Sequence, residues 1–366
     1  WAAPARARRI DANDRIRCGA IGVGNRGSAL LQAILERDDV EVVAIADAYD
    51  VWRDRAVQWC RDKGHKPGDY VRFEEMLDRA RLDAAIVATP DHIHAPAALA
   101  ALDAGLDVYC EKPITLTTET AAAVRDKVHE TGAVFQVGTQ LRSEPMYQKA
   151  RELVQSGAIG KLAMVLVNRH FRWEPRAVPW PPEANAENVH WEEFLRDTPH
   201  YPLDLRRYFH WRDFVEYSNG FTGDLMVHHL DICHFITGCG MPSRVVSAAG
   251  LYAVKDGRTC PDTVGTLAEY PEEFQFNFSA TAANGHYGLV ERYLGSEGTL
   301  EIRDMDRMTV YRQDVKEEVP SNGLQDAPHL ANFFDSMRSR ARIIAPVEAG
   351  FNAATVAHMA VISQRT

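Results

Sequence analysis

The chain has 366 residues, which is enough for two domains of ordinary size. It is 46% hydrophobic and 25% charged, a composition typical of a globular protein with a substantial core. The formal net charge of −10 argues against nucleic acid or an anionic membrane as the main partner, because both attract basic patches. No apolar run reaches the ~18 residues of a membrane span. The six cysteines include no C-x-x-C pair, and we expect neither a zinc site nor a disulfide framework.

Residues 1–14 form an Ala- and Arg-rich arm that lacks the hydrophobic stretch of an intact signal peptide. We interpret it as a mobile or wrapping extension, or as what remains after a signal was cleaved. Residues 15–140 then alternate strands with helices, which predicts right-handed crossovers and a parallel sheet, the doubly wound Rossmann arrangement. Strands are expected within 15–24, 40–48, 82–90, 106–113 and 133–138, helices within 26–39, 95–105 and 117–132, and an edge element with a helix within 70–80.

In residues 141–366 the regular alternation of strands and helices ends, which predicts a second, C-terminal α/β domain. Consecutive strands without intervening helices predict an antiparallel or mixed sheet. The aromatic segment 174–221 is too long for a plain connector, so we expect a functional loop or an oligomer contact there. Strands are expected within 161–173, 244–254, 263–270, 274–282 and 287–303, and helices within 146–160, 224–237, 329–340 and 349–363.

A G-x-G-x-x-G motif, made by Gly22, Gly24 and Gly27, follows the first strand and opens the first helix. Such glycines allow a tight turn, a close approach to pyrophosphate and close packing of the helix on the strand. Asp47 follows 20 residues later, at the end of the second strand, where a carboxylate can accept hydrogen bonds from both ribose hydroxyls. The same carboxylate repels a 2′-phosphate, so NAD is favoured over NADP, although Arg26 and Arg53 could weaken that preference. Three ordinary turn glycines and a capping aspartate are the alternative.

Two further motifs end strands of the first domain, at the edge of the sheet where ligands of this fold bind. One is "ATPDHIHAP" at 88–96. The other is "CEKP" at 110–113, in which Pro113 favours an extended backbone at Lys112 and directs its ammonium group toward the crevice. An ammonium group there can stabilise a developing oxyanion. The full set expected at the cofactor is Gly22, Gly24, Asn25, Arg26, Gly27, Asp47, Thr89, Pro90, His92, His94, Glu111, Lys112 and Gln140.

The stretch "GDLMVHHLD" at 223–231 places two acids and two histidines in one predicted helix, with Thr222 as its N-cap and Gly238 as its terminator. Asp224 and His228 are i,i+4 neighbours, so the carboxylate can orient the imidazole and raise its basicity. A capped helix with satisfied polar side chains is the structural alternative. A metal site is not favoured, because no i,i+4 pair of histidines is present.

Taken together, the motifs "AIGVGNRG", "ATPDHIHAP", "CEKP", "GTQLR" and "GDLMVHHLD" resemble the glucose–fructose oxidoreductase / inositol dehydrogenase (Gfo/Idh/MocA) family over nearly the whole chain. The resemblance implies a Rossmann domain followed by an open-sheet α/β domain that often forms dimers or tetramers. It also implies that the sheet of the second domain is mostly antiparallel and that Lys112, Asp224 and His228 are catalytic. NAD, which some relatives keep tightly bound, is then expected to exchange a hydride with a sugar, glycoside or cyclitol. The segment 191–220 resembles that of an exported bacterial branch, which suggests a periplasmic protein, with the cytoplasm as the alternative.

A polyol substrate needs many hydrogen-bonding groups, and the second half of the chain offers an abundance of them. Two other functions stay open at this stage. Some relatives are glycosidases that use bound NAD in a cycle of oxidation, elimination and reduction, and a non-catalytic sugar binder is also conceivable. The expected substrate residues are Lys112, Arg142, His170, Arg172, Trp173, Tyr208, Trp211, Arg212, Asp224, His228 and His229, with Arg207 and Gln140 as further candidates.

Overall fold

The computed structural model describes residues 14–172, 180–313 and 315–366, and the chain divides into two compact units. Unit 1 contains the described residues up to 138, those from 180 to 211, and 326–351. Unit 2 contains 139–172, the described residues from 212 to 325, and 352–366. The division therefore differs from a single boundary after residue 140, because two later segments return to the first unit. The arm at 1–13 and residues 173–179 lie outside the described residues.

Unit 1 is built on a six-stranded sheet in the order β3-β2-β1-β4-β5-β6, in which all neighbours are parallel. This is the predicted doubly wound topology, and the strand order reverses between β1 and β4, which is where such folds bind ligands. Apart from the short edge strand β3, its strands are apolar runs that are largely buried, as expected for a parallel sheet. They are β1 (Ile16–Ile21), β2 (Val40–Ala46), β3 (Gly68–Tyr70), β4 (Ala84–Val87), β5 (Asp107–Glu111) and β6 (Phe135–Gly138).

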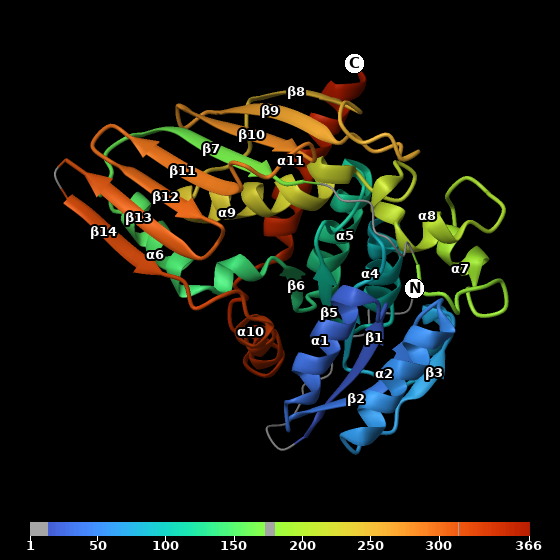
Figure 1. Cartoon of the computed structure of the whole chain (residues 1–366). Coiled ribbons are helices and arrows are strands. Elements are labelled where there is room, and N and C mark those ends of the chain that lie inside the picture. Colours follow the sequence, from blue (N-terminus) through green and yellow to red (C-terminus); the bar gives the residue numbers. More distant parts are fainter. Residues whose placement is uncertain (1–13, 173–179, 314) are drawn as a thin grey trace. The chain divides into compact units, whose positions relative to one another are not determined.

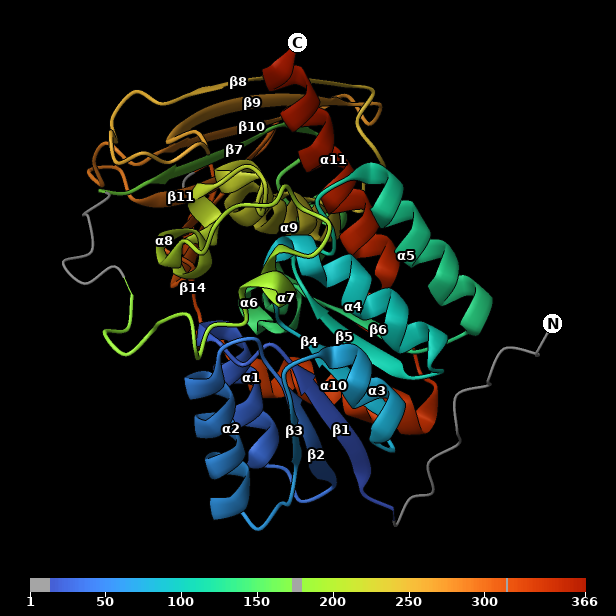
Figure 2. The same ribbon diagram turned by 90° about the vertical axis from the view of Figure 1, so that its right-hand side faces the viewer.

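Helices pack on both faces of this sheet (Figures 1 and 2). The core on one face joins the first two helices to the segment that returns near residue 330, through Leu30, Leu31, Phe333 and Phe334. The helix at 118–131 has both predicted signals, because the Thr117 hydroxyl accepts from the amide of Thr120 and Gly132 ends the helix at φ 64°. The helices are α1 (Asn25–Leu35), α2 (Asp50–Asp62), α3 (Phe73–Arg79), α4 (Asp91–Asp103), α5 (Thr118–Thr131), α7 (Trp191–Leu195), α8 (Leu205–Phe209) and α10 (Asp326–Ser339).

Unit 2 is built on an eight-stranded sheet in the order β14-β13-β12-β11-β7-β10-β9-β8. Only β7 and β10 run parallel and the other neighbours are antiparallel, as the open, mostly antiparallel prediction required. The strands are β7 (Leu162–His170), β8 (Arg244–Gly250), β9 (Thr263–Tyr270), β10 (Phe274–Thr281), β11 (Leu289–Gly295), β12 (Thr299–Arg303), β13 (Arg307–Arg312) and β14 (Val315–Pro320).

One face of this sheet is covered by helices, and in Figure 1 they all lie on the same side of it. They are α6 (Pro145–Gln155), α9 (Val227–Thr237) and the later part of α11 (Val347–Arg365). The alternation of β10 shows why this face is buried, because Phe274, Phe276, Phe278 and Ala280 point into the core while the intervening residues do not. The opposite face carries no helix in the part of the chain that the structure describes.

The structure also contains elements that the sequence patterns did not predict, namely α2, β13 and β14. The aromatic segment is not a plain loop, since it contains α7, α8 and the 3₁₀ turn η2 (Trp211–Asp213). The helix expected at 224–237 is divided into a π-helical turn, η3 (Thr222–Met226), and α9. Thr222 is therefore not an N-cap, and its hydroxyl instead accepts from the Gln364 amide.

Phe276 provides a test of the core of unit 2, because its side chain is fully buried. We expect Phe276→Ala to lower the free energy of unfolding of this unit by about 3–5 kcal/mol, from lost burial and the cavity left behind. Gln275→Ala, on the same strand but the opposite face, should change it by less than about 1 kcal/mol. Urea unfolding followed by circular dichroism measures both, and equal losses in the two variants would contradict the assigned faces.

Candidate functional site

The glycine loop at the start of α1 leaves no room for a side chain at its three glycine positions. Gly22 has φ +83°, and a Cβ there would lie 2.7 Å from the carbonyl oxygen of Ala88. A Cβ on Gly27 would lie 1.9 Å from the carbonyl oxygen of Gly22, and one on Gly24 would lie 2.8 Å from the Trp52 ring. The loop therefore brings backbone amides close together at the start of α1, which is the geometry that binds a dinucleotide pyrophosphate.

Asp47 is tied to this loop by two backbone amides. Its carboxylate accepts a hydrogen bond of 2.7 Å from the amide of Val23 and one of 2.8 Å from the amide of Tyr49. Burial raises the pKa of Asp47 to about 6, although both amides and the nearby Arg53 act in the opposite direction. The carboxylate lies beside the glycine turn, where the sequence predicted the ribose acceptor.

The ends of β4 and β5 are held together by one buried histidine. The Nδ1 atom of His94 lies 2.7 Å from the carbonyl oxygen of Pro113, and its Nε2 atom lies 2.9 Å from that of Thr89. Burial lowers the pKa of His94, and the two carbonyl contacts oppose that effect. Both ring nitrogens of His94 are therefore engaged by backbone carbonyls that follow β4 and β5. The sequence predicted a direct contact with the cofactor for this residue. The arrangement fixes the carbonyl of Pro113, the residue that follows Lys112.

Two other residues predicted to contact the cofactor are engaged within unit 1. Arg26 donates to Glu111 at 2.7 Å and forms a bidentate pair with Asp326 at 2.6 and 2.9 Å, so both strengthen the frame around the loop. His92 is bonded to the carbonyl oxygen of Phe194 at 2.7 Å. Arg53, which could have favoured a 2′-phosphate, pairs with Asp50 at 2.7 Å.

In unit 2, the π turn carries Asp224. π-helical turns insert an extra residue into a helix and are frequent at functional sites. The Asp224 carboxylate lies 3.3 Å from the Nε atom of Arg212 and lines a pocket of ≈ 290 Å³. His228 follows in the first turn of α9 and is partly exposed. The pocket is lined by Arg169, Phe171, Arg212, Asp213, Gly220, Phe221, Asp224, Leu225, Arg258, Cys260 and Pro261.

The wall of this pocket is fixed by a buried ion-pair network. Arg258 donates to both carboxylate oxygens of Asp256, at 2.9 and 2.7 Å, and lies 3.3 Å from Asp213. The amides of Thr259 and Cys260 donate to the backbone carbonyl of Asp213. These bonds satisfy the charge of Arg258, so it serves as a rigid part of the wall.

Two predicted substrate residues have structural roles instead. His229 is 1% exposed, and its Nδ1 atom lies 2.9 Å from Glu291, which is completely buried beneath the sheet. Arg142 pairs with the buried Asp231 at 2.8–3.0 Å. Both side chains are thus engaged in the core of unit 2.

The strand β7 separates His170 from the pocket. His170 lies on the open face of the sheet, where its Nε2 atom is 3.1 Å from the Ser279 hydroxyl, and not on the face that carries the pocket. Arg169, one residue earlier, points to the other face and lines the pocket. The sequence analysis missed Arg169, although the buried Val165 and Val167 indicate its face by period-2 alternation.

The remaining predicted residues are spread over both units. Tyr208 is buried among Tyr49, Phe194 and Phe209 in unit 1, and burial raises its pKa well above the ordinary value. Packing accounts for its position. Gln140 is buried at the start of the 3₁₀ turn η1 (Gln140–Ser143), Trp211 begins η2 and Arg172 is exposed after β7. Trp173 lies outside the described residues.

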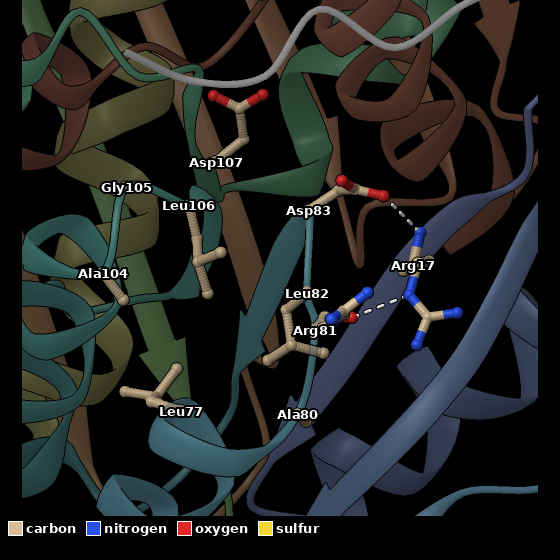
Figure 3. Close-up of a pocket in the computed structure, with 10 residues that line it drawn as sticks. All are labelled: Arg17, Leu77, Ala80, Arg81, Leu82, Asp83, Ala104, Gly105, Leu106 and Asp107. Carbon is tan, nitrogen blue, oxygen red and sulfur yellow. Dashed lines mark hydrogen bonds between the residues drawn. The ribbon is translucent and has the colours of Figure 1, made fainter. Parts of the chain in front are cut away.

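A second pocket, of ≈ 560 Å³, lies in unit 1 where β1, β4 and β5 begin (Figure 3). This is the edge of the sheet opposite the glycine loop. The Arg17 amide donates to Asp83 and its side chain donates to the carbonyl of Arg81, while Asp107 accepts from Arg340. These groups satisfy one another, so the pocket shows no sign of a catalytic function.

The described residues contain neither a metal-binding cluster nor a membrane-spanning helix. No group of three or more histidine, cysteine, aspartate or glutamate side chains is placed to hold a metal ion there. None of the helices in the same residues is both long and apolar enough to cross a membrane.

Comparison with known proteins identifies the family. Residues 16–139 match the GFO_IDH_MocA family, described as "Oxidoreductase family, NAD-binding Rossmann fold", and residues 147–301 match the GFO/IDH/MocA C-terminal domain. The chain belongs to this family of oxidoreductases, and its first domain is an NAD-binding Rossmann domain. The resemblance seen in the sequence motifs is thereby confirmed.

Individual relatives are more distant. The scyllo-inositol 2-dehydrogenase (NAD(+)) of Bacillus subtilis (strain 168) is 25% identical over 230 residues, which cover 63% of this chain and 56% of that protein. A glycosyl hydrolase family 109 protein of Stenotrophomonas maltophilia (strain K279a) is 31% identical over 269 residues, which cover 68% and 57%. The chain thus spans just over half the length of these two relatives. The structure of a levoglucosan dehydrogenase in complex with NADH and levoglucosan has the same fold, with a TM-score of 0.76 at 20% identity over 96% of this chain and 98% of that one.

The raised pKa of Asp47 predicts a pH-dependent affinity for NAD. The carboxylate loses its charge as the pH falls through about 6, and it then accepts hydrogen bonds from ribose hydroxyls less well. We expect the Kd for NAD⁺ to rise between about pH 7.5 and about pH 5, as measured by isothermal titration calorimetry. Asp47→Asn should bind more weakly and lose this pH dependence. A wild-type Kd that stays constant over this range would contradict the prediction.

Proposed function

We propose that the protein is an NAD-dependent dehydrogenase that transfers a hydride between the nicotinamide and a hydroxyl-bearing carbon of a sugar, glycoside or cyclitol. The observation that carries the proposal is the glycine loop with Asp47 beside it, in a chain whose two domains both match one oxidoreductase family. Relatives named for inositol and levoglucosan oxidation support the substrate class. The Asp47 carboxylate supports NAD over NADP, because it repels a 2′-phosphate.

The cofactor fits the residues present. The amides at the start of α1 would hold its pyrophosphate and Asp47 its adenosine ribose. When bound, NAD⁺ supplies the hydride acceptor.

We propose that Lys112, Asp224 and His228 are the catalytic residues. His228 would remove the hydroxyl proton as general base, since imidazole is the side chain that most readily gains and loses a proton near neutral pH. Asp224 would stabilise the resulting imidazolium, and Lys112 would hold the reacting oxygen and stabilise its developing negative charge.

The glycosidase alternative is less well supported. It would use the same residues, and one relative is named a glycosyl hydrolase, but the family description is that of an oxidoreductase. The two functions differ in cofactor turnover, because a dehydrogenase accumulates NADH with excess NAD⁺, whereas a redox glycosidase releases its leaving group without net NADH. A non-catalytic sugar binder would produce neither.

Replacement of the general base provides the mutational test. With a panel of sugars and cyclitols and excess NAD⁺, we expect net NADH from the wild type and a fall in kcat of about 10²–10⁴-fold in His228→Asn. The control is His129→Asn, which removes an exposed histidine of α5 that pairs with Glu348 and should leave kcat unchanged. Calorimetry should show unchanged NAD⁺ affinity in both variants. Full activity of His228→Asn would exclude it as the base.

We further propose that the protein forms a homo-oligomer through the open face of the unit 2 sheet. Val246, Leu267 and Leu166 lie in one row across β8, β9 and β7 on this face, with Asn277 of β10 between the two leucines. Val246 is 54% exposed. An apolar row of this kind on a sheet without a covering helix favours contact with a second copy of the chain.

Leu166→Lys should therefore dissociate the oligomer, because the ammonium group would have to be buried in the contact. Light scattering after size-exclusion chromatography measures the mass. Leu324→Lys places the same charge at a leucine that is already 52% exposed, outside this sheet, and should leave the mass unchanged. A monomeric wild type would contradict the proposal.

Export to the periplasm remains a proposal that rests on the resemblance of segment 191–220 to an exported bacterial branch. Fractionation of the native cells tests it. Recovery in the periplasmic fraction supports export, and recovery in the cytoplasmic fraction alone contradicts it.

A further inference from the structure

The pocket in unit 2 contains an arginine with no partner. Among the described residues, no hydrogen bond or ion pair to the Arg169 side chain is found, and the residue is only partly exposed. The other two arginines of the pocket differ from it. Arg258 is held by Asp256 and Asp213, and Arg212 lies against Asp224. Of the three arginines, Arg169 alone has no ion pair to a carboxylate of the described residues.

The lack of an ion pair to Arg169 among the described residues is informative because of where this side chain lies. It follows Val165 and Val167 on the inward face of β7, and its neighbours across the sheet are Ala280 on β10 and Leu289 on β11, all of them buried and apolar. A charged side chain on such a face is costly unless it is paired. Glu291, two residues along β11 from Leu289 on the same face, is bonded to His229 and Tyr147, and no ion pair joins it to Arg169. We therefore expect the partner of the Arg169 guanidinium to be a ligand.

We propose that Arg169 recognises an anionic group on the substrate, so that the protein prefers acidic sugars to neutral ones. This inference rests on the proposed dehydrogenase function. The guanidinium presents parallel N–H donors that match a carboxylate or a phosphate. Asp224 and Arg169 both line the pocket, and its volume of ≈ 290 Å³ suits a single sugar unit.

The other charged residues of the pocket are not expected to bind the anionic group of the substrate. Asp213 and Asp224 lie in the same pocket and repel an anion that approaches them. Arg258 is held by Asp256 and Asp213, and Arg212 lies against Asp224, whereas Arg169 has no ion pair among the described residues. The anionic group is therefore expected to lie at Arg169, with the hydroxyl-bearing part of the sugar toward Asp224.

The test compares matched sugars as substrates of the full-length protein. Glucose, galactose and mannose are each compared with their uronates, aldonates and 6-phosphates, and NADH formation is followed with excess NAD⁺. We expect kcat/KM to be at least about tenfold higher for one anionic class than for the neutral sugar, as is usual for a hydrogen-bonded charged contact. Preference for uronates or aldonates assigns the group as a carboxylate, and preference for the 6-phosphates assigns it as a phosphate.

Arg169→Met then tests the residue. It should raise KM for the preferred anionic sugar about 10–100-fold, leave kcat/KM for neutral sugars nearly unchanged, and weaken binding of the anionic sugar in calorimetry by a similar factor. Arg169→Lys, which keeps the charge, should restore part of the affinity. The control Arg303→Met removes an arginine from the open face, where it pairs with Glu301, and should have no effect on KM.

Three results would overturn the inference: neutral sugars that are turned over as well as the acids, equal losses for both in Arg169→Met, or a loss of thermal stability in that variant without a change in KM. Failure of the proposed function would look different, because no sugar or cyclitol of either class would then reduce NAD⁺.

Discussion

The steric exclusion of side chains from the loop between β1 and α1 is the constraint on which the interpretation of unit 1 depends. A methyl group on Gly27 would overlap the carbonyl oxygen of Gly22, and the turn at Gly22 requires a positive φ. This close packing places the start of α1 and the Asp47 carboxylate side by side, because the amide of Val23 donates to that carboxylate. A dinucleotide site is thus formed by backbone atoms and one acid, and it needs few specific side chains.

In unit 2, the packing of helices on the sheet positions the side chains around the pocket. Its sheet buries a continuous apolar face beneath α6, α9 and α11, and the polar residues on that side are either paired in the core or gathered around one pocket. The His229–Glu291 pair anchors the inner side of α9 to β11. The π turn that precedes α9 carries Asp224 at the pocket, and α9 itself is fixed by its buried side.

Much of the architecture could be predicted from the sequence because the local signals agree with the fold. The alternation of buried strands and capped helices indicated the Rossmann sheet, and the Thr117 cap and the Gly132 terminator lie where the pattern placed them. The glycine motif and Asp47 were found because their spacing is set by a short, local geometry. The direction of isolated polar side chains was harder to predict. His170 and Arg169 are adjacent, yet strand alternation sends only Arg169 toward the pocket.

The π turn shows a further limit of sequence patterns. An ordinary α-helical spacing was expected from residue 224 onward, and an inserted residue has no signature in hydrophobic periodicity. The return of 180–211 and 326–351 to unit 1 likewise depends on tertiary packing, as in the contacts of Phe333 and Phe334 with the first core.

Isotope transfer shows directly whether the protein moves a hydride from a sugar carbon to the nicotinamide. The protein is incubated with NAD⁺ and sugars and cyclitols that carry deuterium at their hydroxyl-bearing carbons, and the nicotinamide is then analysed by mass spectrometry. The account predicts that deuterium accumulates in reduced nicotinamide in proportion to oxidised sugar. Persistent absence of deuterium from the nicotinamide across the whole set would contradict it.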